Sequence, residues 1–117
     1  MAKDDYFVIV AKILLFLYKH LKGKTQEKVE DYIQPNTKEF PISEDYMFYV
    51  MRHMYEDDLV EGVCTRVTPD GTILEINFLD DMTNITPKGI AYLRENSMIQ
   101  KALKSIPALA AIAGSIL

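Results

Sequence analysis

The chain is poor in the residues that build covalent or metal-held sites. It has one cysteine, Cys64, among 117 residues, and its five glycines are isolated. A single cysteine excludes an intrachain disulfide framework and fits a reducing cytoplasm. Isolated glycines exclude a glycine-rich phosphate loop. His20 and His53 have no Cys or His nearby at ligand spacing, so we expect neither a metal nor another cofactor.

Long apolar runs are missing as well. Residues 6–18 are apolar-rich but contain Lys12, and the apolar tail 107–117 has only 11 residues. Both segments are too short to span a bilayer. Residues 1–7 lack the basic start and apolar core of a signal peptide. We therefore expect a cytoplasmic protein.

A recognisable catalytic pattern is also lacking. Cys64 falls in an expected strand without a His or Asp partner close by in sequence, which predicts a buried structural thiol. The acidic groups at 57–61 and 80–81 do not follow the calcium-loop pattern. Helix ends and turns explain these groups better, so we expect that the protein is not an enzyme.

Charge is unevenly distributed along the chain, whose net charge is −4. Residues 1–30 hold six lysines against four acidic residues, whereas residues 31–62 hold Lys38 and Arg52 against eight. Because Lys and Arg neutralise the phosphates of nucleic acids, the acidic middle segment argues against DNA contact there.

The first helix is expected from about Asp4 to Lys22, with Asp4 or Asp5 as its cap and Gly23 after its end. Its apolar residues form two neighbouring stripes. One stripe comprises Tyr6, Ile9, Val10, Ile13, Leu14, Leu17 and Leu21, and the other Phe7, Val8, Ala11, Leu15 and Tyr18. A helix that is apolar on two sides must be covered twice.

Two further helices are expected before the chain becomes extended. The second runs from Thr25 to Ile33 and stops at Pro35. The third starts at Ser43 and ends at Asp57-Asp58, where Asp58 is expected in a left-handed or turn conformation. Its predicted core residues are Met47, Val50, Met51 and Met54.

The remainder combines a hairpin with two helices. Residues 59–68 and 72–78 are β-rich and flank a Pro69-Asp70-Gly71 turn. Thr86-Pro87 predicts the start of a helix that ends near Asn96, and another follows from about Ser97 to at least Ser105. Pro107 breaks or restarts that helix. Three helices followed by a hairpin predict a mainly α, winged helix-turn-helix domain over 1–97, with an extra C-terminal helix in 98–117.

Two motifs resemble a known family. They are ISEDYMFYVMRHMYEDDLVEGV (42–63) and ITPKGIAYLRENS (85–97), and YFVIVAKILLFLY (6–18) is similar to the family's first helix. The resemblance is to the YjcQ-like family of small winged-helix proteins of bacteria and phages. It covers most of residues 5–104. The family pattern usually has Trp where Met47 stands and Gly where Asp58 stands.

The outward face of the third helix is a candidate contact surface. It carries Asp45, Phe48, Tyr49, Arg52 and Tyr55. Only Arg52 suits base reading, whereas exposed aromatic residues favour a protein partner. In an alternative interpretation, the second helix covers Phe48 and Tyr49.

The basic residues offer a second candidate contact. Lys19, His20, Lys22, Lys24 and Lys28 cluster where the first helix ends. They form either a solvated face or a contact to a DNA backbone. The expected wing has Arg66 as its only basic residue for a DNA contact, and the acidic Asp70 is close to it in sequence.

The apolar C-terminal segment needs a covering surface. We expect it to pack on the second stripe of the first helix, within one chain or between two, and a homodimer built there is our hypothesis. The residues of that contact would be Val8, Ala11, Leu15, Tyr18, Ile99, Leu103 and Ile106. A membrane-surface role is disfavoured because the tail lacks basic residues.

Two functions remain open at this stage, with a DNA-binding regulator as the leading interpretation and a protein-interaction module as the alternative. The fold and the resemblance favour a DNA-binding transcriptional regulator of bacterial or phage type. The acidic, aromatic third helix favours a protein-interaction module that has lost DNA binding. The surface potential around the third helix and the wing separates them, because DNA requires a continuous positive groove.

Overall fold

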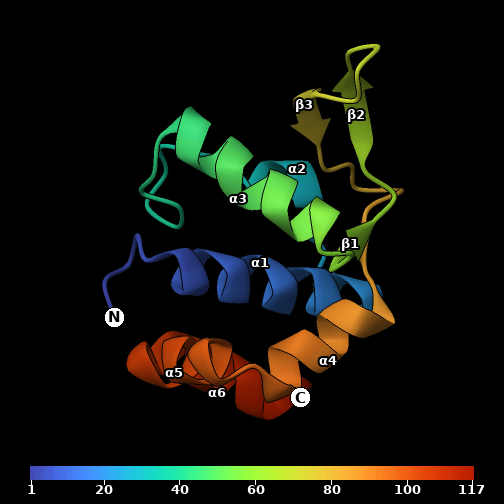
Figure 1. The fold of residues 1–117 in the computed structure, drawn as a ribbon. Helices are drawn as coiled ribbons and strands as arrows, with labels where there is room; N and C mark the ends of the chain where they lie inside the picture. The colour runs from blue at the N-terminus through green and yellow to red at the C-terminus, as the bar shows by residue number, and fades with distance from the viewer.

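Helix α1 (Tyr6–Leu21) is the centre of the fold in the computed structural model, which describes residues 1–117. Every residue from Val8 to Tyr18 is buried. In Figure 1, α1 lies between an upper layer with α2 and α3 and a lower layer with α4, α5 and α6. The prediction that both apolar stripes of this helix are covered is therefore confirmed between Val8 and Tyr18, whereas Leu21, at the end of the first stripe, is 50% exposed.

The upper layer contains α2 (Val29–Tyr32) and α3 (Glu44–Glu56). Ser43 caps α3, its Oγ accepting a hydrogen bond from the Tyr46 backbone N–H at 3.1 Å. The four predicted core residues of α3 are all buried: Met47, Val50, Met51 and Met54.

The second helix is shorter than predicted. It spans four residues, not the nine from Thr25 to Ile33. The Thr25 hydroxyl does accept a hydrogen bond from the Glu27 N–H, but this closes a local turn and the helix does not start there. It starts at Val29, whose N–H donates to the Asp80 carboxylate at 2.9 Å.

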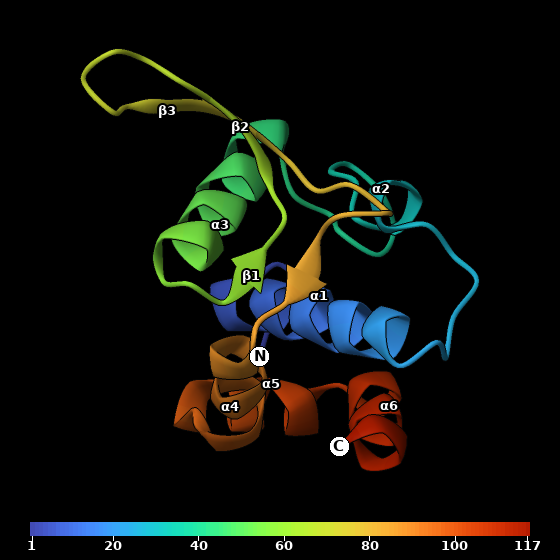
Figure 2. The same ribbon diagram turned by 90° about the vertical axis from the view of Figure 1, so that its right-hand side faces the viewer.

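The strands form two small antiparallel pairs. The predicted hairpin is confirmed around its turn as β2 (Cys64–Val67) and β3 (Ile73–Asn77), with an irregularity between Arg66 and Val67. The expected first strand, 59–68, is too long, because residues 60–61 leave the hairpin. The hairpin extends past α3 in Figure 2. The other pair joins β1 (Val60–Glu61) to β4 (Asn84–Ile85). The sequence did not predict this pair, because two-residue strands have no readable alternation.

The lower layer consists of α4 (Pro87–Glu95), α5 (Ser97–Ser105) and α6 (Pro107–Ile116). Thr86 caps α4 with Pro87 at its first position, as predicted. All three helices contact α1 within the same chain. None of the helices is long and apolar enough to cross a membrane.

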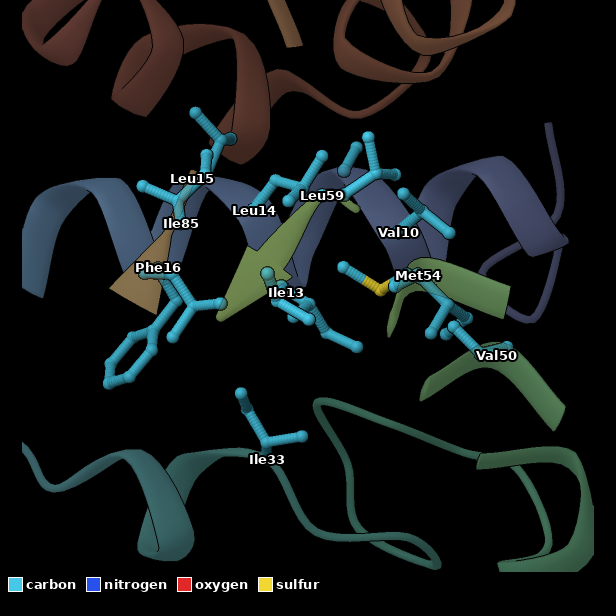
Figure 3. Close-up of a cluster of buried hydrophobic side chains, with 14 of the residues drawn as sticks. Val10, Ile13, Leu14, Leu15, Phe16, Ile33, Val50, Met54, Leu59 and Ile85 are labelled. Atoms are coloured by element: carbon cyan, nitrogen blue, oxygen red, sulfur yellow. The ribbon is translucent and has the colours of Figure 1, made fainter. Parts of the chain in front are cut away.

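The core gathers around the middle of α1. In Figure 3, side chains of α1 meet Val50 and Met54 of α3, Ile85 of β4 and Ile33 from the end of α2. The β1–β4 pair lies against α1 and ties the upper layer to the lower one. The fold is thus mainly helical, with a small antiparallel β component, as predicted.

Candidate functional site

A groove of about 750 Å³ lies beside α3. Its walls come from the side of α3 that carries Asp45, Phe48 and the core residues Met47 and Met51, from β3 and the two residues after it, and from α2 and the turn that follows it. Apolar residues form much of the lining, namely Ile33, Pro35, Met47, Phe48, Met51, Leu74, Ile76, Phe78 and Leu79. The groove is thus open to solvent along one side of the helix that the sequence singled out.

The charged residues that line this groove are all acidic. They are Glu30, Glu44, Asp45 and Glu75. Glu44 and Asp45 occupy the first turn of α3, where a negative charge also stabilises the helix dipole. Hydrogen bonds from Asn77 and Arg66 lower the pKa of Glu75, so this carboxylate is ionised at neutral pH. The groove therefore presents negative charge around an apolar floor.

The two arginines considered as possible contacts to a partner or to DNA are already paired within the chain. Arg52 binds Glu56 at 2.8 Å, one turn later on α3. Arg66 binds Glu75 across the hairpin at 3.1 Å. Each guanidinium thus already has a carboxylate partner within the chain.

The aromatic residues of α3 lie in different surroundings. Phe48 is half-buried and lines the groove. Tyr49 is 48% exposed and contacts Tyr6 edge-on and the His53 ring. Tyr55 is exposed. Neither Tyr49 nor Tyr55 lines the groove, and α1, not the second helix, approaches Tyr49.

The lysine cluster lies away from the hairpin. Figure 2 shows segment 22–28 on the opposite side of the molecule from the hairpin tip. Lys22 is tethered, with its Nζ 2.6 Å from the Ile116 carbonyl oxygen and 4.4 Å from the centre of the Tyr18 ring. Lys24 and Lys28 are exposed, and Lys19 is half-buried. These lysines do not extend the surface formed by α3 and the hairpin.

The residues expected to form a dimer contact are placed inside one chain. Of the seven, only Ile106 is not buried. The reason is that α5 and α6 fold back onto their own α1. A dimer built on these residues would have to exchange the C-terminal helices between two chains.

The prediction that Cys64 is buried is wrong, because its side chain is exposed. Cys64 begins β2 and pairs in register with Asn77. A two-stranded hairpin has no third layer on its outer side, so a small apolar residue there remains open to solvent.

The Asp80 carboxylate makes contacts that the sequence did not predict, because we expected it only to form a turn. Asp80 accepts hydrogen bonds from the Val29 N–H and from His20 Nε2 at 3.0 Å. The hydrogen bond from Val29 is the main cause of its lowered pKa. Asp80 is 51 residues from Val29 in sequence, so no local pattern could have indicated this contact.

In the comparison with known families, residues 12–110 match the model of the YjcQ protein family. The chain belongs to the YjcQ protein family. Neither the comparison with curated proteins nor that with solved structures finds a match.

The structure describes both positions at which the chain departs from the pattern of the resemblance. Asp58, where that resemblance implies Gly, has a φ of +61°, the left-handed conformation that Gly adopts without strain. Met47, in place of Trp, is buried in the core. The predicted turn conformation at Asp58 is thereby confirmed.

Proposed function

We propose that this YjcQ protein is a non-enzymatic protein-interaction module built on a winged helix-turn-helix arrangement, in which α3 corresponds to the recognition helix and the β2–β3 hairpin to the wing. The order of three helices, a hairpin and further helices supports this assignment. The partner would be a basic, amphipathic protein segment bound in the groove between α3 and β3. The homodimer considered from the sequence is not needed for this function.

The observation that carries the proposal is the charge of the groove. All charged residues that line it are acidic, and they surround an apolar floor. A partner with apolar anchors and flanking Lys or Arg would complement both properties. DNA phosphates would instead meet like charge, because Glu44 and Asp45 stand at the start of α3.

DNA binding is the second candidate function. Its support is the winged arrangement together with the exposed Lys24 and Lys28, which could contact a phosphate backbone from another side of the molecule. This mode would be independent of sequence, and its affinity would fall steeply with salt.

The test uses a designed helical peptide of Leu and Lys that contains one Trp. The protein itself has no tryptophan, so the peptide supplies the only indole fluorescence. We expect binding of this peptide but not of a counterpart with Glu in place of Lys. The double variant Glu44→Gln/Asp45→Asn should weaken binding about tenfold, and Phe48→Ala should weaken it through the lost apolar contact.

The matched control is Asp81→Asn/Glu95→Gln, which removes the same charge at exposed positions outside the groove. It should bind the Lys peptide as the unmodified protein does. Equal loss in both double variants would show attraction to net charge alone and contradict the proposal. A gel shift of bulk DNA that disappears with salt, without peptide binding, would favour the second candidate.

A further inference from the structure

A second cavity, of about 350 Å³, lies between α1, the segment around α2 and the start of α6. It shares no lining residue with the groove beside α3. Apolar side chains from α1 and from the C-terminal helices face it: Leu15, Phe16, Ile106, Leu109 and Ile112. Its volume lies within the range of small-molecule sites, at the small end.

The charge of this cavity is opposite to that of the groove. Its lining includes Lys3, Lys12, Lys19 and Lys38 but only two acidic residues, Glu27 and Glu39. The excess of positive charge occurs in a chain whose net charge is −4. The cavity is therefore a local exception, and an anion is the ligand that its charge favours.

Lys12 is the key residue of this cavity. It sits in the middle of α1, and its side chain is only 10% exposed. Its Nζ donates to the Glu39 carbonyl oxygen at 2.6 Å, while the Glu39 carboxylate is 3.6 Å away and mostly exposed. An ammonium group can donate three hydrogen bonds. The ammonium thus already has an ion-pair partner in the Glu39 carboxylate, and its remaining N–H donors can bind a second, anionic acceptor.

Tyr32 supplies a second polar group on the wall. Its ring stacks on Phe16 with the centroids 4.2 Å apart. Burial, followed by nearby Glu39 and Glu27, raises the pKa of Tyr32 to about 12. The phenol therefore keeps its proton at neutral pH and can donate a hydrogen bond to an anion.

We propose that this cavity binds a small amphipathic carboxylate, whose anionic group meets the Lys12 ammonium and whose apolar body lies against Leu15, Leu109 and Ile112. A medium acyl chain and a fused aromatic ring both satisfy this description. Because α6 forms one wall of the cavity, the ligand would join α1 to the C-terminal helix and stabilise the folded chain.

Titration calorimetry with octanoate and 1-naphthoate tests this inference. We expect saturable 1:1 binding of at least one probe, and the stronger one tells whether the site prefers a chain or a ring. Octylammonium lacks the anionic group and acetate lacks the apolar body, so both should bind at least tenfold more weakly. Failure of both carboxylates to bind at millimolar concentration, or equal binding of octylammonium, would overturn the proposal.

Variants locate the site. Lys12→Met keeps the long apolar stem but removes the ammonium, and it should weaken the better carboxylate about tenfold, whereas the exposed Lys88→Met on α4 should not. Should Lys12→Met not fold, Ile112→Trp decides the matter by filling the cavity from its half-buried edge. If the folded variant, Lys12→Met or Ile112→Trp, binds the carboxylate as tightly as the unmodified protein does, the proposed site is wrong. The groove variant Glu44→Gln/Asp45→Asn should bind the carboxylate normally, so the two proposals fail independently.

Discussion

The hydroxyl group of Thr86 connects two distant parts of the chain. Its Oγ1 accepts a hydrogen bond from the Gly89 N–H at 2.9 Å, which caps α4. It also donates to the Asp58 carbonyl oxygen at 2.6 Å, just after α3. The side chain is buried, so water cannot replace either partner when the hydroxyl is removed.

Thr86→Ala should therefore lower the free energy of unfolding by about 1–3 kcal/mol. Thr86→Ser keeps both hydrogen bonds and loses only a methyl group, so it should lose less than half as much. Urea unfolding followed by circular dichroism measures both. Equal losses would assign the effect to the methyl group instead.

Asp58 holds a conformation that costs energy for any residue with a β-carbon. Its φ is +61°, whereas φ at the preceding Asp57 is −83°. Asp58→Gly should raise the free energy of unfolding by about 1 kcal/mol because it relieves the left-handed strain. Asp57→Gly should lower it by about 0.5–1 kcal/mol, and a gain at both positions would contradict the backbone argument.

At the scale of the elements, α4 packs closely on Leu59, the residue just before β1, because Gly89 has no side chain. A β-carbon there would clash with the Leu59 carbonyl oxygen and lie 2.8 Å from Ile85 Cγ1. This close approach places β4 and α4 beside β1. It also gives a structural reason for the glycine in the ITPKG motif.

Glycine in a helix is normally a weak point, so Gly→Ala substitutions usually stabilise. Gly89→Ala should instead destabilise the protein by about 1–3 kcal/mol, the usual cost of overpacking. Gly114→Ala, in α6 with nothing near its added β-carbon, should stabilise by about 0.5–1 kcal/mol. In thermal unfolding, Gly89→Ala should lower the Tm and Gly114→Ala should raise it. A higher Tm in both variants would refute the close contact at Gly89.

Asp80 links three elements, since it lies after β3 and binds both the Val29 N–H of α2 and His20 of α1. Its pKa is lowered below 3.8, chiefly by the Val29 hydrogen bond. A lowered pKa in the folded state contributes stability above the unfolded-state pKa. That stability is lost as the pH falls through the folded-state value.

We therefore expect Asp80→Asn to be less stable than the unmodified protein at pH 7 and to approach it as the pH falls below about 3.8. Asp81→Asn, at the exposed next position, serves as the control and should leave the pH profile unchanged. Urea unfolding at a series of pH values measures the difference. A constant gap between Asp80→Asn and the unmodified protein would contradict the linkage.

At the scale of the whole molecule, α6 completes the cover of α1. Leu109 and Ile116 are buried, and the Ile116 carbonyl oxygen accepts a hydrogen bond from Lys22. The lower layer therefore depends on the last eleven residues. Without them, part of the second apolar stripe of α1, including Leu15, would face solvent.

Deletion of residues 107–117 should lower the free energy of unfolding by about 3–6 kcal/mol, from the two buried side chains alone. The shortened chain should also self-associate through the uncovered stripe. Deletion of Leu117 alone, which is 39% exposed, is the control and should cost little. In light scattering, a mass of 13.4 kDa for the full chain would indicate that the tail packs within one chain, and a doubled mass would favour the homodimer hypothesis.

The sequence by itself determined much of the secondary structure. Features that depend on residues close together in sequence were predictable. They are the two stripes of α1, the helix caps Ser43 and Thr86, and the hairpin turn Pro69-Asp70-Gly71. The left-handed Asp58 was predictable for the same reason. The sequence indicated the acidic character of the groove beside α3 only through the acidic segment 31–62. That segment does not show which residues share a surface.

Only the tertiary structure decided how distant segments meet. Asp80 binds the start of α2, which begins later than predicted, and Cys64 is exposed on an uncovered face of the hairpin. Strand β1 pairs with β4, and the C-terminal helices pack on α1 of the same chain. The tertiary structure also placed Glu75 beside α3 and Lys12 at a cavity wall. These contacts depend on the packing of side chains far apart in sequence, and local periodicity carries no information about that packing.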